Sequence, residues 1–232
     1  MNNEKFVLPI LKWSSWQQQS EQPVSPDVSF LDLSLRRKLG LLTKMCLQVA
    51  NDCAGYDPDV RVVFASRHGD LVRTTGMLEE IVSGEPLSPT AFSMAVLNAS
   101  TGVYSMLAKN IWPSTAISAG EHTFAMGLLE AGLQWLSQPD QPVLYLYAED
   151  VAPAIYQTGD AGTYVPHALG ILLSDASPLY KVSIRMESLK TPALAATMPM
   201  SMAWMESMRQ QHAASWQGDG RAWHWEFDHA AH

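Results

Sequence analysis

The stretch that decides the fold is Pro113–Phe124, which reads Pro-Ser-Thr-Ala-Ile-Ser-Ala-Gly-Glu-His-Thr-Phe. Its first half is typical of a short strand at 114–118, and Gly120 supplies a tight turn because glycine tolerates backbone angles that other residues avoid. Apolar residues then recur at helical spacing from Phe124 to Trp135. The segment therefore predicts a strand, a sharp turn and a helix over 121–137, with Glu121 at the helix N-terminus.

The rest of the chain alternates in the same way between strand-like runs and helical periodicity. Further strands are expected at 6–11, 61–66, 143–147, 168–173 and 181–186. Helices are expected at 35–49 with Ser34 as N-cap, at 70–82, and at 92–109 behind Ser88-Pro89. Strands separated by helices favour right-handed crossovers, so we expect an α/β fold with a mostly parallel mixed sheet covered by helices.

Composition limits the possible functions. The 232 residues are 47% hydrophobic, which suits a sizeable core, and the net charge of −8 argues against binding nucleic acid. No stretch reaches the length of a membrane span and no signal peptide is evident, so we expect a cytoplasmic protein without membrane insertion. Cys46 and Cys53 lie seven positions apart in a helical pattern and read as packing residues, and we expect neither a metal nor a cofactor.

The helix and strand that lead up to the Gly120 turn resemble the corresponding block of the β-ketoacyl synthases, the carbon–carbon bond-forming enzymes of fatty acid and polyketide assembly. Residues 143–150 and 168–173 are similar to later strands of the same family, and the resemblance covers residues 60–187. It implies a thiolase-like half-fold, with five strands. The residues that match in order and spacing ahead of the Gly120 turn are Ser88, Pro89, Asn98, Gly102, Pro113, Ser114 and Ile117.

The chain departs from an active synthase in two ways. Glu121 stands where the family has its nucleophilic cysteine, and a carboxylate cannot carry an acyl group as a thiolate does. The family's second half, which supplies the catalytic histidines, has no counterpart. The resemblance therefore implies no catalytic residue here.

These departures resemble the chain length factors, homologues without a nucleophile that pair with an active ketosynthase, and in particular the short versions of aryl polyene pathways. The resemblance implies a heterodimer that meets acyl carrier protein only through its ketosynthase partner. It also implies a contact surface beside the partner's acyl tunnel, formed by Ala91, Phe92, Ala95, Asn98, Tyr104, Thr115, Ile117 and Ala119.

A serine hydrolase is the alternative. Ala116-Ile117-Ser118-Ala119-Gly120 is similar to a hydrolase nucleophile elbow with Ala in place of the first Gly, which makes Ser118 a candidate nucleophile. Asp175 and a later histidine would keep the Ser, Asp, His order. His122 reads as an exposed or packing residue.

The pattern weakens beyond Leu189, where methionine and tryptophan become frequent. We therefore expect a synthase-like domain over 1–187 and an extension over 188–232 that packs on the domain or on a partner. The methionines at 198–208 are typical of an adaptable core or a helix face.

Overall fold

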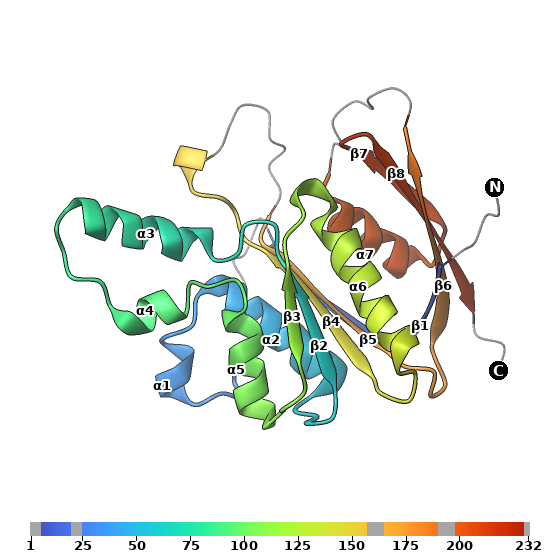
Figure 1. Cartoon of the computed structure of the whole chain (residues 1–232), viewed down its shortest axis with the longest axis horizontal. Coiled ribbons are helices and arrows are strands. Elements are labelled where there is room, and N and C mark those ends of the chain that lie inside the picture. Colours follow the sequence, from blue (N-terminus) through green and yellow to red (C-terminus); the bar gives the residue numbers. More distant parts are fainter. Residues whose placement is uncertain (1–5, 20–24, 157–164, 190–197, 230–232) are drawn as a thin grey trace.

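The computed structural model describes residues 6–19, 25–156, 165–189 and 198–229, and the described elements form one mixed sheet covered by helices (Figure 1). The strands are β1 (Phe6–Gln17), β2 (Arg61–Ala65), β3 (Ser114–Ile117), β4 (Val143–Glu149), β5 (His167–Leu173), β6 (Tyr180–Ser188), β7 (Ala214–Gly218) and β8 (Arg221–His229). The α-helices are α1 (Leu33–Arg36), α2 (Leu41–Ala54), α3 (Leu71–Val82), α4 (Pro89–Ser93), α5 (Ala99–Ala108), α6 (Thr123–Ser137) and α7 (Met200–Gln210). Two short 3-10 turns complete the set, η1 (Gly120–His122) and η2 (Ala154–Tyr156).

The sheet order is β3-β2-β4-β5-β1-β6-β8-β7, so the expected α/β class is confirmed but the strand count of five is wrong. The expectation of a mostly parallel sheet is also wrong, because β2 is parallel to β3 and β4 while the other five neighbouring pairs are antiparallel. Helical crossovers join β2, β3 and β4, and such connections produce parallel pairs. A six-residue β5–β6 connection and a two-residue β7–β8 turn reverse the chain instead.

Two hydrophobic cores lie on opposite faces of the sheet. Helices α6 and α7 cover one face, where Phe124, Leu128 and Trp204 are buried, and α2 and α5 cover the other, where Met45 and Val103 are buried. Strands β2 and β4 are buried along their whole length because helices cover them on both sides.

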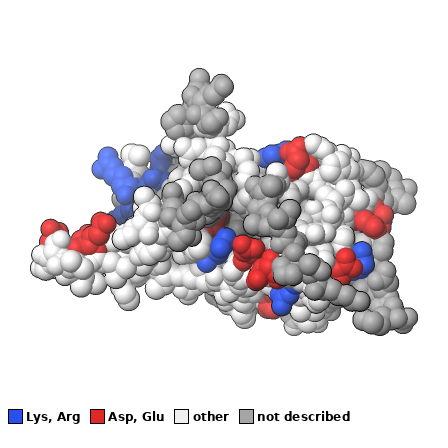
Figure 2. All heavy atoms as spheres, turned by 90° about the horizontal axis from the view of Figure 1, so that it is seen from above, with Lys and Arg blue, Asp and Glu red and all other residues white. Residues whose placement is uncertain are grey.

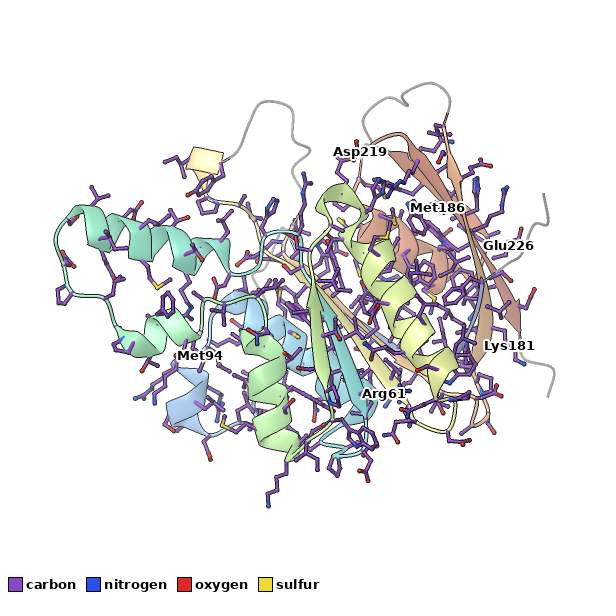
Figure 3. All side chains as sticks on the ribbon, in the orientation of Figure 1. Arg61, Met94, Lys181, Met186, Asp219 and Glu226 are labelled. Carbon is purple, nitrogen blue, oxygen red and sulfur yellow. The ribbon has the colours of Figure 1, made fainter. Side chains whose placement is uncertain are left out.

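Helix α6 sits unusually close to the sheet. A Cβ at Gly127 would lie 2.6 Å from the Cβ of Ala65, and the Tyr145 hydroxyl donates to the Phe124 carbonyl at 2.6 Å. At the other end of α6, the buried Arg61 guanidinium donates to the carbonyls of residues 134, 138 and 141 at 2.7–3.0 Å (Figure 3). Both ends of the helix that follows the Gly120 turn are therefore fixed to the central strands.

Two expected helices are each divided. The helix expected at 35–49 begins instead at Leu41 after the short α1, because Gly40 is extended (ψ 170°), and a Cβ there would lie 2.7 Å from an Asp70 carboxylate oxygen. The helix expected at 92–109 is α4 and α5, separated at Asn98, which takes the N-cap position of α5. Asp70 and Ser88 cap α3 and α4 with their side chains.

The region 188–232 continues the same sheet beyond the expected boundary at residue 187. Helix α7 packs against β7 and β8, where Trp204 contacts Trp225, and β8 pairs with β6 along its whole length. Asp219 and Gly220 both have positive φ (44° and 72°), as a two-residue hairpin turn with right-handed strand twist requires. The two expected regions, 1–187 and 188–232, begin and end with residues 1–5 and 230–232, which lie outside the described residues.

Candidate functional site

The Gly120 turn has the expected strand, turn and helix. Gly120 has φ 57°, in the left-handed region that favours glycine, and it begins η1, which leads from β3 into α6. The Thr123 hydroxyl donates to the Gly120 carbonyl at 2.7 Å and accepts the Ala119 N–H at 2.9 Å. The turn is thus held by its own side chain and presents its outer residues to solvent.

Glu121 is exposed on this turn, two residues before α6 begins. The partial positive charge of a helix N-terminus stabilises an acid there. Glu121 therefore has the position of a solvent-exposed acid in the first turn of a helix, and the described residues do not enclose its side chain in a pocket.

The hydrolase alternative is contradicted by the positions of its residues. The Ser118 hydroxyl donates to the Arg67 carbonyl at 2.8 Å, at the end of the sheet where β3 finishes. Asp175 follows β5, and the register pairs Leu173 with Val143 at the start of β4, whereas the β3 end lies beside Tyr147. Ser118 and Asp175 therefore lie at opposite ends of the sheet, roughly 15–20 Å apart at the usual strand rise, and cannot form a triad.

His122 is more enclosed than the sequence indicated. Its side chain is 4% exposed and lies between the Trp216 and Trp223 rings of the β7–β8 hairpin, at centroid distances of 5.7 and 6.2 Å. The Trp223 indole Nε1 donates to His122 Nδ1 at 3.3 Å. Asp219, at the tip of the hairpin (Figure 3), places a carboxylate oxygen 3.9 Å from His122 Nε2. The C-terminal hairpin is thus fastened onto the Gly120 turn, a contact that sequence reasoning missed.

A buried polar cluster lies beneath the same end of the sheet. His167 Nε2 contacts the Ser201 hydroxyl at 2.7 Å, and Nδ1 lies 2.9 Å from the Val165 carbonyl, to which it must donate. The Ser201 hydroxyl therefore donates to Nε2. Burial lowers the pKa of His167 to about 4.

Glu149 is the acidic member of this cluster. One oxygen accepts the Arg67 N–H at 2.8 Å and the Tyr147 hydroxyl at 3.3 Å, while the other is buried and has no hydrogen bond to any described residue. Burial raises the pKa of Glu149 to about 7, against the lowering effect of those two donors. The ring of Phe124 packs on Tyr147, which joins the cluster to the start of α6. The only sequence signal for this polar cluster was Glu149, an acidic residue directly after an apolar strand.

The residues expected at a partner surface lie around the β3 edge. Strand β3 pairs with β2 on one side and has no described strand on its other side. Helices α3 and α4 project past this edge as an arm (Figure 1), and Phe92 on α4 is 60% exposed. Ala91, Ala95, Thr115, Ile117 and Ala119 are half-buried and Asn98 is exposed.

Tyr104 is the exception among those residues. It is 1% exposed and belongs to the core beneath α2 and α5, where burial raises the pKa of its hydroxyl well above the usual value. It cannot contact a partner while this core is intact, so its assignment to the partner surface is wrong and we remove it from that surface.

Exposed apolar side chains are frequent on the arm, on α5 and in the segment that leads into β3. Much of the arm visible in Figure 2 is uncharged, with acidic groups near its tip. The large hydrophobic side chains that are at least one-third exposed here are Val72, Leu78, Ile81, Val82, Leu87, Phe92, Val96, Met106, Ile111 and Trp112. Such a concentration is typical of an interaction site in a folded domain.

The histidines, acids and cysteines of the described residues are arranged as follows. The described part of the chain contains no group of three or more His, Cys, Asp or Glu side chains placed to hold a metal ion. Cys46 and Cys53 are free and buried in α2, and burial raises the pKa of both thiols to about 12. None of the described helices has the length and apolarity needed to cross a membrane.

Comparison with known proteins decides the family. A model of the β-ketoacyl synthase N-terminal domain matches residues 11–226, which is most of the chain. The chain belongs to this family. No curated protein sequence matches it.

Solved structures agree on the synthase fold. A structure of the ketosynthase ApeO in complex with its chain length factor ApeC from Xenorhabdus doucetiae contains a chain that superposes with a TM-score of 0.80 at 23% identity, over 95% of this chain and 99% of that one. The ishigamide ketosynthase/chain length factor gives 0.59 at 16% identity, over 79% and 67%. A β-ketoacyl synthase from Burkholderia phymatum gives 0.55 at 12% identity, over 82% of this chain and 60% of that one.

Proposed function

We propose that this chain is a non-catalytic ketosynthase-like subunit, a chain length factor that pairs with an active ketosynthase and shapes its acyl tunnel. The observation that carries the proposal is the edge of β3, which pairs with no further described strand, beside the exposed apolar arm of α3 and α4. A free sheet edge and an apolar surface are liabilities in a domain that works alone, and a partner subunit that covers both removes them.

The chemistry of the chain supports a non-catalytic role. Glu121 offers no thiolate at the position that matches the family nucleophile, and it faces solvent. Cys46 and Cys53 cannot substitute, because they are buried in α2 with a raised pKa. The partner would therefore supply the nucleophile and the histidines, and would receive the acyl group from its carrier protein.

The likeness to one chain of the ApeO–ApeC structure, over 95% of this chain and 99% of that one, supports a short chain length factor of the aryl polyene type. The match to the Burkholderia synthase covers 60% of that chain. We place it in the cytoplasm, in a polyketide or fatty-acid-type pathway. The contact surface is that of Ala91, Phe92, Ala95, Asn98, Thr115, Ile117 and Ala119, with Phe92 near the partner's acyl tunnel.

Co-expression with an active ketosynthase from the same organism tests the proposal. We expect a one-to-one complex, and we expect the chain alone to remain without an acyl adduct when it is incubated with acyl-thioester donors and weighed intact. Ile117→Asp should break the complex, while Ser215→Asp on the opposite edge strand, β7, should leave it intact. Thermal unfolding of both variants verifies that each remains folded.

Product length tests the second part of the proposal. Phe92→Ala should lengthen or broaden the products of the complex without abolishing activity, because the chemistry belongs to the partner. Leu179→Ala, at a similarly exposed leucine (50%) in the β5–β6 turn, is the control and should change nothing. If Ile117→Asp and Phe92→Ala alter neither assembly nor product length, the proposal fails.

A further inference from the structure

His122 joins two segments that are far apart in the sequence, the Gly120 turn and the β7–β8 hairpin. Its ring is 4% exposed, with Trp216 at a right angle to it and Trp223 tilted against it. Both nitrogens face the hairpin. Nδ1 lies 3.3 Å from Trp223 Nε1, and the buried Nε2, which has no hydrogen-bond partner in the described structure, lies 3.9 Å from an Asp219 carboxylate oxygen.

The Trp223 contact determines where the proton of a neutral His122 resides. An indole nitrogen can only donate, so His122 Nδ1 must present its lone pair to Trp223. The single proton of the neutral ring is then on Nε2, the nitrogen that points toward Asp219. At 3.9 Å this N–H is too far from the carboxylate for a hydrogen bond.

Protonation of the ring changes both contacts. The imidazolium carries a second N–H on Nδ1, which would face the Trp223 N–H as donor against donor. At the same time its positive charge attracts the Asp219 carboxylate, which is 77% exposed and free to approach. The neutral and charged rings therefore favour different partners on one hairpin.

We propose that His122 is a pH-sensitive clasp between the Gly120 turn and the C-terminal hairpin. In the neutral state the Trp223 hydrogen bond on β8 holds the hairpin. In the protonated state that bond is released and an ion pair with Asp219 at the hairpin tip replaces it. The clasp needs no partner subunit, so it can be tested independently of the proposed function.

The groups that face His122 make this exchange specific. Asp219 approaches from the β7–β8 turn, Trp216 and Trp223 approach from β7 and β8, and Glu121 is the charged neighbour on its own element. Trp225 provides an internal comparison, because its indole nitrogen is buried without a hydrogen bond and its ring packs on Trp204 instead.

The test is nuclear magnetic resonance of the ¹⁵N-labelled full chain through the pH range in which histidines titrate. The Trp223 indole signal is assigned from its loss in Trp223→Phe. We expect this signal to shift, and its N–H to exchange faster with water, over the same pH interval in which the His122 ring signals titrate. The Trp225 indole signal should stay constant.

Three variants complete the test. His122→Gln keeps an acceptor for Trp223 but cannot titrate, so the Trp223 transition should disappear. Asp219→Asn removes the anion, so no ion pair draws the protonated ring away and the change of the Trp223 signal should become smaller. His224→Gln, at a neighbouring histidine that contacts Glu187, should leave the transition unchanged. A Trp223 signal that ignores His122 titration, a transition that survives His122→Gln, or unfolding before His122 titrates would each overturn the proposal.

Discussion

Glu149 and His167 lie directly opposite each other on the antiparallel strands β4 and β5, and both side chains are buried. Residues opposite each other share one face of a sheet, so the two side chains face the α6 and α7 core together with Tyr145 and Tyr147. Burial raises the pKa of Glu149 to about 7 and lowers the pKa of His167 to about 4. The folded chain therefore favours the uncharged form of both groups.

The two pKa shifts have opposite effects on stability. The contribution of Glu149 to the free energy of unfolding is complete below the ordinary pKa of 4.5, and it is lost as the pH rises toward about 7. The His167 contribution is complete above its ordinary pKa of 6.5 and is lost as the pH falls toward about 4. Between pH 4.5 and 6.5 the two slopes, each about 1.4 kcal/mol per pH unit, cancel.

Single substitutions should expose each slope. Glu149→Gln removes the Glu149 slope and leaves that of His167. When the pH is lowered from 6.5 to 4.5, the free energy of unfolding of this variant should therefore decrease by about 3 kcal/mol relative to that of the parent chain. In His167→Gln it should fall as the pH rises through the same interval. Urea unfolding at several pH values measures both. Variants whose pH dependence matches that of the parent chain would show that neither group is held uncharged.

A second prediction concerns the close approach of α6 to the sheet. Gly127→Ala places a methyl group 2.6 Å from Ala65 and 2.8 Å from the Tyr145 ring, so we expect a loss of about 1–3 kcal/mol from overpacking. Gly102→Ala is the matched control, because it is an exposed helical glycine with nothing within 4 Å. The control should gain roughly 0.5–1 kcal/mol. Equal effects in thermal unfolding would contradict the packing.

Arg61 provides a third prediction. Its guanidinium satisfies three carbonyls at and after the end of α6, and a lysine cannot reproduce this fork. Arg61→Lys should cost about 1–3 kcal/mol in chemical unfolding because buried carbonyls lose their donors. Arg185→Lys, in an exposed pair with Glu187, should cost less than about 1 kcal/mol. A variant at 61 as stable as the one at 185 would refute this role.

The fourth prediction tests the missing nucleophile. Glu121→Cys should give an exposed thiol whose pKa is lowered by the N-terminus of the helix, and it should react readily with alkylating reagents. The variant should still not condense acyl groups, because the family's second half supplies the catalytic histidines. Steady turnover by this variant without a partner subunit would show that the chain holds more of the catalytic machinery than we assign to it.

Local patterns in the sequence were sufficient for the centre of the fold. The Gly120 turn, the helix that follows Asp70 and the buried strands β2 and β4 all follow from short-range signals that the structure confirms. The C-terminal hairpin also had a signal that was missed. Apolar Trp223, Trp225 and Phe227 alternate with polar residues behind an Asp-Gly pair, which is the period of a strand after a hairpin turn.

The candidate site depends on contacts that no local pattern contains. His122 meets Trp223 across 101 positions, and His167 meets Ser201 across 34. Tyr104 shared a helical face with residues that reach the surface, yet it is buried because α2 packs on α5. Sequence periodicity assigns a face to a residue, but only the packing of the whole chain decides what covers that face.

The most direct measurement of the central claim is hydrogen–deuterium exchange of the chain, alone and in complex with an active ketosynthase from the same organism. The peptide that spans residues 113–119 contains the β3 edge, and its amides should exchange markedly more slowly in the complex. The peptide of the other edge strand, β7 at 214–218, should exchange at the same rate in both samples. Unchanged exchange at 113–119 in a mixture with that ketosynthase, or equal protection of both edges, would contradict the account.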